Sequence, residues 1–163
     1  MPIVKTLVWH DENDTQRCAA ALASQAGLRN CFVALHGELG AGKTSFTRHL
    51  LRSLGVQGRI KSPTYAVVEP YSLLPDGEHP NALDIWHFDF YRFNDPREWE
   101  DAGFRELFAS AGLKIAEWPE KAAAFLPAAD LDIHISVQDD AVRRLRLVAG
   151  TPRGVQLLQA LRP

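Results

Sequence analysis

The chain carries the residues of a phosphate-binding loop between positions 37 and 44. Gly37, Gly42, Lys43 and Thr44 fit the pattern G-x-x-x-x-G-K-[ST]. Glycines let backbone N–H groups turn towards phosphate oxygens, the lysine ammonium neutralises the terminal phosphates, and the threonine hydroxyl can bind Mg²⁺. We therefore expect this loop to bind a nucleoside triphosphate, with Lys43 among the catalytic residues and Thr44 among the metal ligands.

The segments on either side of the loop predict the elements that such a loop needs. Residues 31–36 are almost wholly apolar, which is typical of a strand buried on both faces of a parallel sheet. Residues 44–55 space their leucines as a helix does and end at Gly55. The helix would point its N-terminus, with its partial positive charge, at the bound phosphate.

Two carboxylates could complete a triphosphate site by binding Mg²⁺ or orienting a water molecule. Asp89 shares a strand face with His87, and Glu117 ends a short strand just before Pro119. The alternatives are a solvated acid on a half-exposed strand for Asp89 and a helix-entry acid for Glu117. The residues alone do not rank the two acids. His87 and Asp89 have no third ligand nearby, so we interpret His87 as a strand-face histidine rather than a ligand of a transition metal.

The remaining segments predict an α/β domain. We expect a helix over 11–27, with Asp14 or Thr15 as its N-cap and Gly27 as its stop, and a helix over 95–110 capped by Asp95. The other expected elements are strands at 3–9, 65–73, 82–93, 112–118, 131–137 and 143–149, and a closing helix at 151–163. Buried parallel strands together with hairpins indicate a P-loop NTPase-like, three-layer α/β fold, with a mixed sheet flanked by helices in a single domain, residues 1–163.

Composition limits the possible partners and the compartment. The net charge is −2, so no global basic field attracts nucleic acid: DNA binding is not expected, and direct RNA binding would need a local patch. Arg143, Arg144 and Arg146 form a basic cluster that is either a solvated face or a place where its inward-facing member meets phosphate or RNA. The two cysteines, with no signal peptide and no membrane-length apolar run, predict a cytoplasmic protein with reduced thiols.

Four blocks in order resemble one family: "GELGAGKTSFTR", "KSPTYAVVEPY", "HFDFYR" and "EWPE". Together they are similar to the bacterial tRNA threonylcarbamoyladenosine biosynthesis ATPases, the TsaE (YjeE) family. The phosphate loop alone is shared by many enzymes, whereas the ordered set is much more specific. The blocks extend from Gly37 to Glu120 and leave both flanks loosely matched.

The resemblance implies an ATPase that acts with two further proteins, TsaB and TsaD, and meets tRNA only through that complex. It implies that Mg²⁺ is bound by Thr44 and Glu117, with Asp89 near the γ-phosphate as a catalytic or metal-binding acid. It also implies a switch loop at Ser62, Pro63, Thr64 and Tyr65. The residues that would surround the nucleotide are Thr15, Leu39, Gly40, Ala41, Gly42, Lys43, Thr44, Ser45, Trp118 and Arg143.

Two other functions use the same loop. A small-molecule or nucleoside kinase would need an arginine-bearing lid, which we do not find in the sequence. A nucleotide-sensing module would bind the nucleotide without useful hydrolysis. No N-K-x-D sequence is present, so the guanine-reading element of GTPases is absent and ATP is preferred over GTP.

Overall fold

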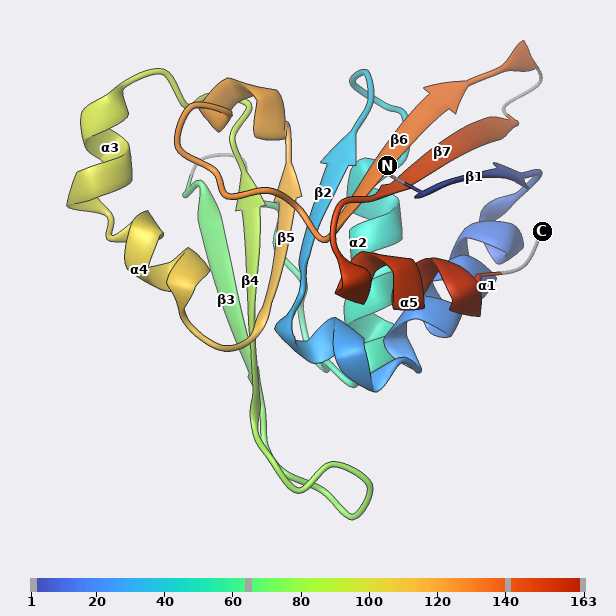
Figure 1. Ribbon diagram of the computed structural model, residues 1–163, viewed down its shortest axis with the longest axis horizontal. Coiled ribbons are helices and arrows are strands. Elements are labelled where there is room, and N and C mark those ends of the chain that lie inside the picture. Colours follow the sequence, from blue (N-terminus) through green and yellow to red (C-terminus); the bar gives the residue numbers. More distant parts are fainter. Residues whose placement is uncertain (1–2, 64–65, 140–141, 162–163) are drawn as a thin grey trace.

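A seven-stranded mixed sheet runs through the molecule in the order β1-β7-β6-β2-β5-β4-β3 (Figure 1). The structure is a computed structural model that describes residues 3–63, 66–139 and 142–161. Strands β6, β2, β5 and β4 pair in parallel, whereas the pairs β1–β7, β6–β7 and β3–β4 are antiparallel. The strands are β1 Ile3–Trp9, β2 Phe32–His36, β3 Val68–Leu73, β4 Leu83–Asp89, β5 Leu113–Glu117, β6 Leu131–Val137 and β7 Arg143–Ala149.

Helices pack on both faces of this sheet and give the predicted three layers. They are α1 Glu12–Ala23, α2 Lys43–Leu54, α3 Pro96–Asp101, α4 Phe104–Ala109 and α5 Pro152–Ala160, with 3₁₀ turns η1 Ala26–Asn30 and η2 Pro119–Ala122. Helices α1, α2 and α5 share the larger core with one face of the sheet. Helices α3 and α4 and turn η2 cover the other face beside β4, β5 and the start of β2, and the β3–β4 hairpin projects beyond the body (Figure 1).

The prediction for the first helix was wrong at both ends. The N-cap is Asp11, whose side chain accepts the N–H of Asp14, so neither Asp14 nor Thr15 caps the helix. The helix ends at Ala23, and Gly27 lies inside the following 3₁₀ turn. Asp14 and Thr15 lie inside the helix instead. The acids of the first turn, Glu12 and Asp14, interact favourably with the positive helix N-terminus without capping it.

The expected helix over 95–110 is two short helices. Asp95 caps α3 as predicted, by accepting the N–H of Arg97. Gly103 then adopts a left-handed conformation with φ 70°, and α4 begins after it. Glycine takes this conformation without a Cβ clash, so it interrupts an otherwise helical pattern.

Strand β4 is covered on both faces, which contradicts the half-exposed strand considered for Asp89. Asp89 is 7% exposed and His87 is 1% exposed. The neighbour Phe88 is buried in the aromatic cluster with α4 on the opposite face. The alternation of polar and apolar residues predicted a solvent-exposed face. That face is buried by α2, which is distant in the sequence, so local alternation could not reveal the burial.

Two expectations from composition can be compared with the structure. Cys18 and Cys31 are free and buried, as predicted. Burial raises the pKa of each thiol to about 11. Of the helices in the described ranges, none is both long and apolar enough to cross a bilayer.

Candidate functional site

The phosphate loop connects the central strand β2 to helix α2, as the sequence predicted. Gly37 passes so close to β6 that a Cβ there would lie 2.6 Å from the carbonyl oxygen of Ile135. Gly42 precedes α2 with φ 113° and offers no side chain to cap its first turn. The helix N-terminus is therefore open to an anionic ligand, as in other phosphate loops.

The Lys43 ammonium lies inside the loop and contacts backbone carbonyls. It donates to the carbonyl oxygens of Gly37 and Glu38, at 3.0 Å for the second. It also lies 4.0 Å from the centre of the Trp118 ring, a cation–π contact. Burial lowers the pKa of Lys43, and the nearby carboxylates of Glu117, Glu120 and Asp89 oppose that shift.

The Glu117 carboxylate at the end of β5 joins the loop to β4. Thr44 Oγ1 donates to one carboxylate oxygen at 2.8 Å, and His87 Nε2 donates to the other at 2.6 Å. Glu117 is 2% exposed. The His87 Nδ1 atom is buried without a hydrogen-bond partner among the described residues, which favours the tautomer with its proton on Nε2.

Asp89 lies directly beside Glu117, because the two residues are register partners on β4 and β5. Its carboxylate accepts the Tyr91 N–H at 2.9 Å. Burial raises the pKa of Asp89, and the Glu117 charge raises it further, whereas the Tyr91 hydrogen bond opposes the shift. A buried acid with a raised pKa beside a second acid is a typical functional arrangement.

These residues line a hollow of about 490 Å³ on one side of the loop, which we call the acid side. It brings together most of the predicted site: Leu39, Gly40, Ala41, Gly42, Lys43, Thr44, Ser45, Asp89, Glu117 and Trp118. Ser62 of the expected switch loop also lines it, whereas Thr64 and Tyr65 lie outside the described residues. Trp118 has a left-handed backbone with φ 55°, an unusual conformation for a residue with a side chain and one often found at functional sites.

A second hollow of about 510 Å³ lies on the other side of the loop, which we call the edge side. Thr15 and Arg143 line it, together with Ser45 and loop residues. Arg143 Nε donates to the carbonyl oxygen of Ala41 at 2.9 Å. Both loosely matched residues thus lie at the loop, but across it from the acids.

Comparison with known proteins gives the family of the chain. Residues 9–145 match the family described as "Threonylcarbamoyl adenosine biosynthesis protein TsaE". The chain belongs to the TsaE family. It is therefore a component of tRNA threonylcarbamoyladenosine biosynthesis, as the sequence resemblance indicated. The family match extends beyond the blocks at 37–120 into both flanks.

Individual TsaE proteins align over much of the chain. The Haemophilus influenzae tRNA threonylcarbamoyladenosine biosynthesis protein TsaE is 42% identical, over 78% of this chain and 76% of its own length. The Bacillus subtilis protein of the same description is 32% identical, over 97% of this chain and 95% of its own length. The crystal structure of Bacillus subtilis YdiB superposes with a TM-score of 0.77 at 27% identity, covering 98% of this chain and 94% of that one. The predicted α/β fold with a mixed sheet is confirmed.

Several residues at this site were not predicted from the sequence. Tyr91 and Arg92 line the acid-side hollow, and His87 and Glu12 make hydrogen bonds at the loop. His87 was interpreted as a strand-face histidine, yet it hydrogen-bonds Glu117, and no local spacing in the sequence indicates that bond. Glu12 on α1 accepts from Ser45 Oγ at 2.5 Å and contacts His49 Nε2 at 2.7 Å on the edge side. The hydrogen bond from Ser45 lowers the pKa of Glu12 the most, and the one from His49 lowers it further. No pattern in the sequence linked Glu12 to the loop.

The donor set suits Mg²⁺ better than a transition metal. Within the described ranges, no group of three or more His, Cys, Asp or Glu side chains could hold a metal ion. Mg²⁺ is usually bound by one or two carboxylates together with substrate phosphates and water. The Thr44 hydroxyl and the Glu117 carboxylate, hydrogen-bonded at the start of α2, match that requirement.

Proposed function

We propose that this chain binds ATP with Mg²⁺ and hydrolyses it as the ATPase that acts with TsaB and TsaD in tRNA threonylcarbamoyladenosine biosynthesis. The observation that carries the proposal is the buried Glu117 carboxylate, hydrogen-bonded to Thr44 of the phosphate loop and to His87. A structural acid would not need a phosphate-loop hydroxyl as its partner. Membership of the TsaE family supports the assignment of this proposed ATPase to tRNA threonylcarbamoyladenosine biosynthesis.

The loop and its lysine would hold the triphosphate. Phosphate oxygens suit the open N-terminus of α2, and Lys43 supplies a cation inside the loop. Burial keeps this ammonium away from bulk water, so its interaction with phosphate is stronger than at the surface. Holding the phosphates rigidly provides much of the catalysis in phosphoryl transfer.

Thr44 and Glu117 would bind Mg²⁺. When bound, Mg²⁺ supplies positive charge that neutralises the charge developing on the phosphates. His87 fixes the orientation of the Glu117 carboxylate through the 2.6 Å hydrogen bond. In metal sites, such partners of the ligands typically affect affinity or activity as well.

Asp89 would orient the attacking water and take up its proton. Its raised pKa makes it a stronger base than an ordinary aspartate, and the Tyr91 N–H holds its carboxylate in place. We find no arginine finger from the sequence, so turnover by the chain alone should be slow. A missing finger costs about 10³–10⁵-fold in related NTPases.

The test is phosphate release from ATP by the purified chain, measured alone, with TsaB and TsaD, and with a panel of nucleoside acceptors. We expect slow Mg²⁺-dependent release that TsaB and TsaD accelerate, with no phosphorylated acceptor. Transfer of phosphate to an acceptor would establish a kinase instead. ATP binding without phosphate release under every condition would establish a nucleotide-sensing module.

A further inference from the structure

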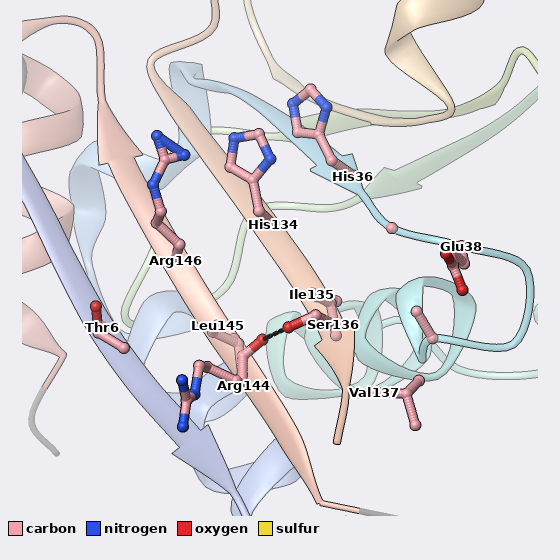
Figure 2. Close-up of a pocket in the computed structure, with 12 residues that line it drawn as sticks. Thr6, His36, Glu38, His134, Ile135, Ser136, Val137, Arg144, Leu145 and Arg146 are labelled. Carbon is pink, nitrogen blue, oxygen red and sulfur yellow. Dashed lines mark hydrogen bonds between the residues drawn. The ribbon is translucent and has the colours of Figure 1, made fainter. Parts of the chain in front are cut away.

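A row of polar side chains crosses the sheet from its β1 edge to its centre. Thr6 on β1, Arg146 on β7, His134 on β6 and His36 on β2 are successive register partners. Register partners on neighbouring strands point to the same face of a sheet. Figure 2 shows Arg146, His134 and His36 side by side, with their side chains extended in the same direction.

No helix of the described residues packs over this part of the sheet. Helices α1, α2 and α5 share a core with the opposite face, while α3, α4 and η2 cover β4, β5 and the first residues of β2, Phe32 and Ala34. Val4 and Val8, which point to the same face as Thr6, are 50% and 39% exposed. Arg144, two residues from Arg146, is exposed on the same face, and a hollow of about 590 Å³ lies over the row.

Positive charge accumulates on β7 and β6, in the middle of this row. Among the described residues, the side chains of Arg144, Arg146 and His134 have no hydrogen bond or ion pair. The acids gather at the β2 end instead, around His36. Asp132 Oδ1 lies 2.7 Å from His36 Nε2, and Glu120 Oε2 lies 3.8 Å from His36 Nδ1.

The two histidine rings are stacked, and His134 lies near the positive charge of Arg146. The His36 and His134 rings are 4.2 Å apart at an interplanar angle of 15°. Burial lowers the pKa of His134, and His36 and Arg146 lower it further, whereas Asp132 and Glu120 oppose the shift. An anion in the hollow would offset this repulsion.

We infer that this face, defined by Thr6, His36, His134, Arg144 and Arg146, binds a single strand of RNA. The two guanidinium groups would contact backbone phosphates, and the imidazoles would hydrogen-bond phosphates or base edges. An open sheet surface that presents aromatic rings and guanidinium planes suits unstacked RNA bases better than an acidic peptide. The net charge of −2 shows only that such binding must be local, and this face is a local patch. The inference goes beyond the proposed ATPase function and requires no ATP.

The test measures anisotropy of a fluorescein-labelled single-stranded oligoribonucleotide over a range of salt concentrations, without nucleotide. The variants are the double substitution Arg144→Ala with Arg146→Ala, the conservative pair Arg144→Lys with Arg146→Lys, and Arg105→Ala as a control. Arg105 is an exposed arginine of α4, away from the face. Each lost phosphate contact reduces the slope of log K against log salt by about 0.7 for single strands, so the double alanine variant should lose about 1.4. The lysine pair and the control should keep the wild-type slope.

The pH dependence of the same binding tests the role of His134. RNA favours the charged imidazole, so affinity should rise as pH falls through the lowered pKa of His134. The groups that face this ring are His36 from β2, Arg146 from β7, Asp132 from β6 and Glu120 from η2. In His134→Asn, RNA affinity should rise less than in the wild type as pH falls.

Four results would overturn the inference. They are no RNA binding by the wild type, an unchanged salt slope in the double alanine variant, displacement of RNA by polyglutamate as readily as by unlabelled RNA, and a dimer in sedimentation that the double alanine variant abolishes. The third would assign the face to an acidic protein segment and the fourth to a second copy of the chain. Thermal melting of each variant checks that it remains folded. None of these results would alter phosphate release from ATP, so failure here is distinct from failure of the ATPase proposal.

Discussion

The two sides of the phosphate loop are built from different parts of the fold. The acid side comes from the ends of the central strands β4 and β5, where Asp89 and Glu117 are 7% and 2% exposed. The edge side comes from helix α1 and the hairpin strand β7, where Glu12 is 68% exposed. One side is a preformed network inside the sheet, and the other is a set of surface side chains around Ser45 and Arg143.

The difference suggests a division of labour across the loop. Burial shifts the pKa values of Lys43 and Asp89, and such costs are typical of groups that do chemistry. The exposed hydrogen bonds of the edge side cost little and suit recognition of the remainder of a nucleotide. Changes on the acid side should therefore lower the hydrolysis rate, and changes on the edge side should weaken binding.

The largest effect should follow from Lys43→Ala, because it removes the ammonium that donates to the loop carbonyls of Gly37 and Glu38. We expect loss of both tight ATP binding and hydrolysis, by about a hundredfold or more in phosphate release. Lys121→Ala, at an exposed lysine of η2, is the control. Wild-type turnover in Lys43→Ala would remove the loop from the mechanism.

A smaller effect on the Mg²⁺ dependence of hydrolysis should distinguish two substitutions of His87. His87→Gln keeps an N–H donor that can reach Glu117, whereas His87→Asn is too short to do so. We expect His87→Asn to raise the Mg²⁺ concentration needed for half-maximal hydrolysis by about 10–100-fold, and His87→Gln to restore most of that loss. Equal behaviour of the two variants would mean that His87 only fills space.

Arg143→Ala tests the edge side. It should weaken ATP binding several-fold in a nucleotide titration while leaving the saturated hydrolysis rate unchanged, because the contact is to Ala41 rather than to the acids. Arg144→Ala is a matched control, since that residue is adjacent on β7 but points to the opposite face. A fall in the saturated rate with unchanged binding would contradict the division between the sides.

The smallest effect concerns stability at Asp89. Its folded pKa is raised, so the native state gains stability as pH falls and loses it as pH rises through that pKa. At pH 7 the charged carboxylate therefore costs stability, and Asp89→Asn should melt higher, by about 2–4 °C for each kcal/mol relieved. The gain should shrink at low pH, where the wild-type acid is protonated.

The control for this prediction is Asp84→Asn, at an exposed position of the same strand, where Asp84 accepts from Ser72. It should not raise the melting temperature. A lower melting temperature in Asp89→Asn would show that the carboxylate stabilises the fold.

The sequence was most informative where a local pattern determines the structure. The apolar segment 31–36 and the alternation in 131–137 gave β2 and β6 within one residue. Gly103 was not recognised as a helix break, because a helical pattern tolerates an isolated glycine until tertiary packing selects its left-handed conformation. The order of the strands in the sheet could not be predicted from local patterns either, because it depends on contacts between distant segments.

The same distinction applies to the site. Lys43 and Thr44 follow from a contiguous motif. Asp89 and Glu117 were proposed from their strand positions, and the family resemblance then assigned their roles. The His87–Glu117 hydrogen bond required the parallel pairing of β4 with β5, which no local spacing reveals. Arg144 and Arg146 were visible as a basic cluster, but only the register places His134 and His36 beside them.

The most direct test of the central claim compares Glu117→Gln with wild type in the presence of TsaB and TsaD, measuring ATP binding and Mg²⁺-dependent phosphate release on the same samples. Glu120→Gln is the matched control, because that carboxylate is 51% exposed and lies 3.8 Å from His36 Nδ1, whereas Thr44 donates to Glu117. We expect Glu117→Gln to bind ATP while its phosphate release falls by about 10²–10³-fold, and Glu120→Gln to match wild type. Wild-type phosphate release by Glu117→Gln, with unchanged Mg²⁺ dependence, would contradict the account.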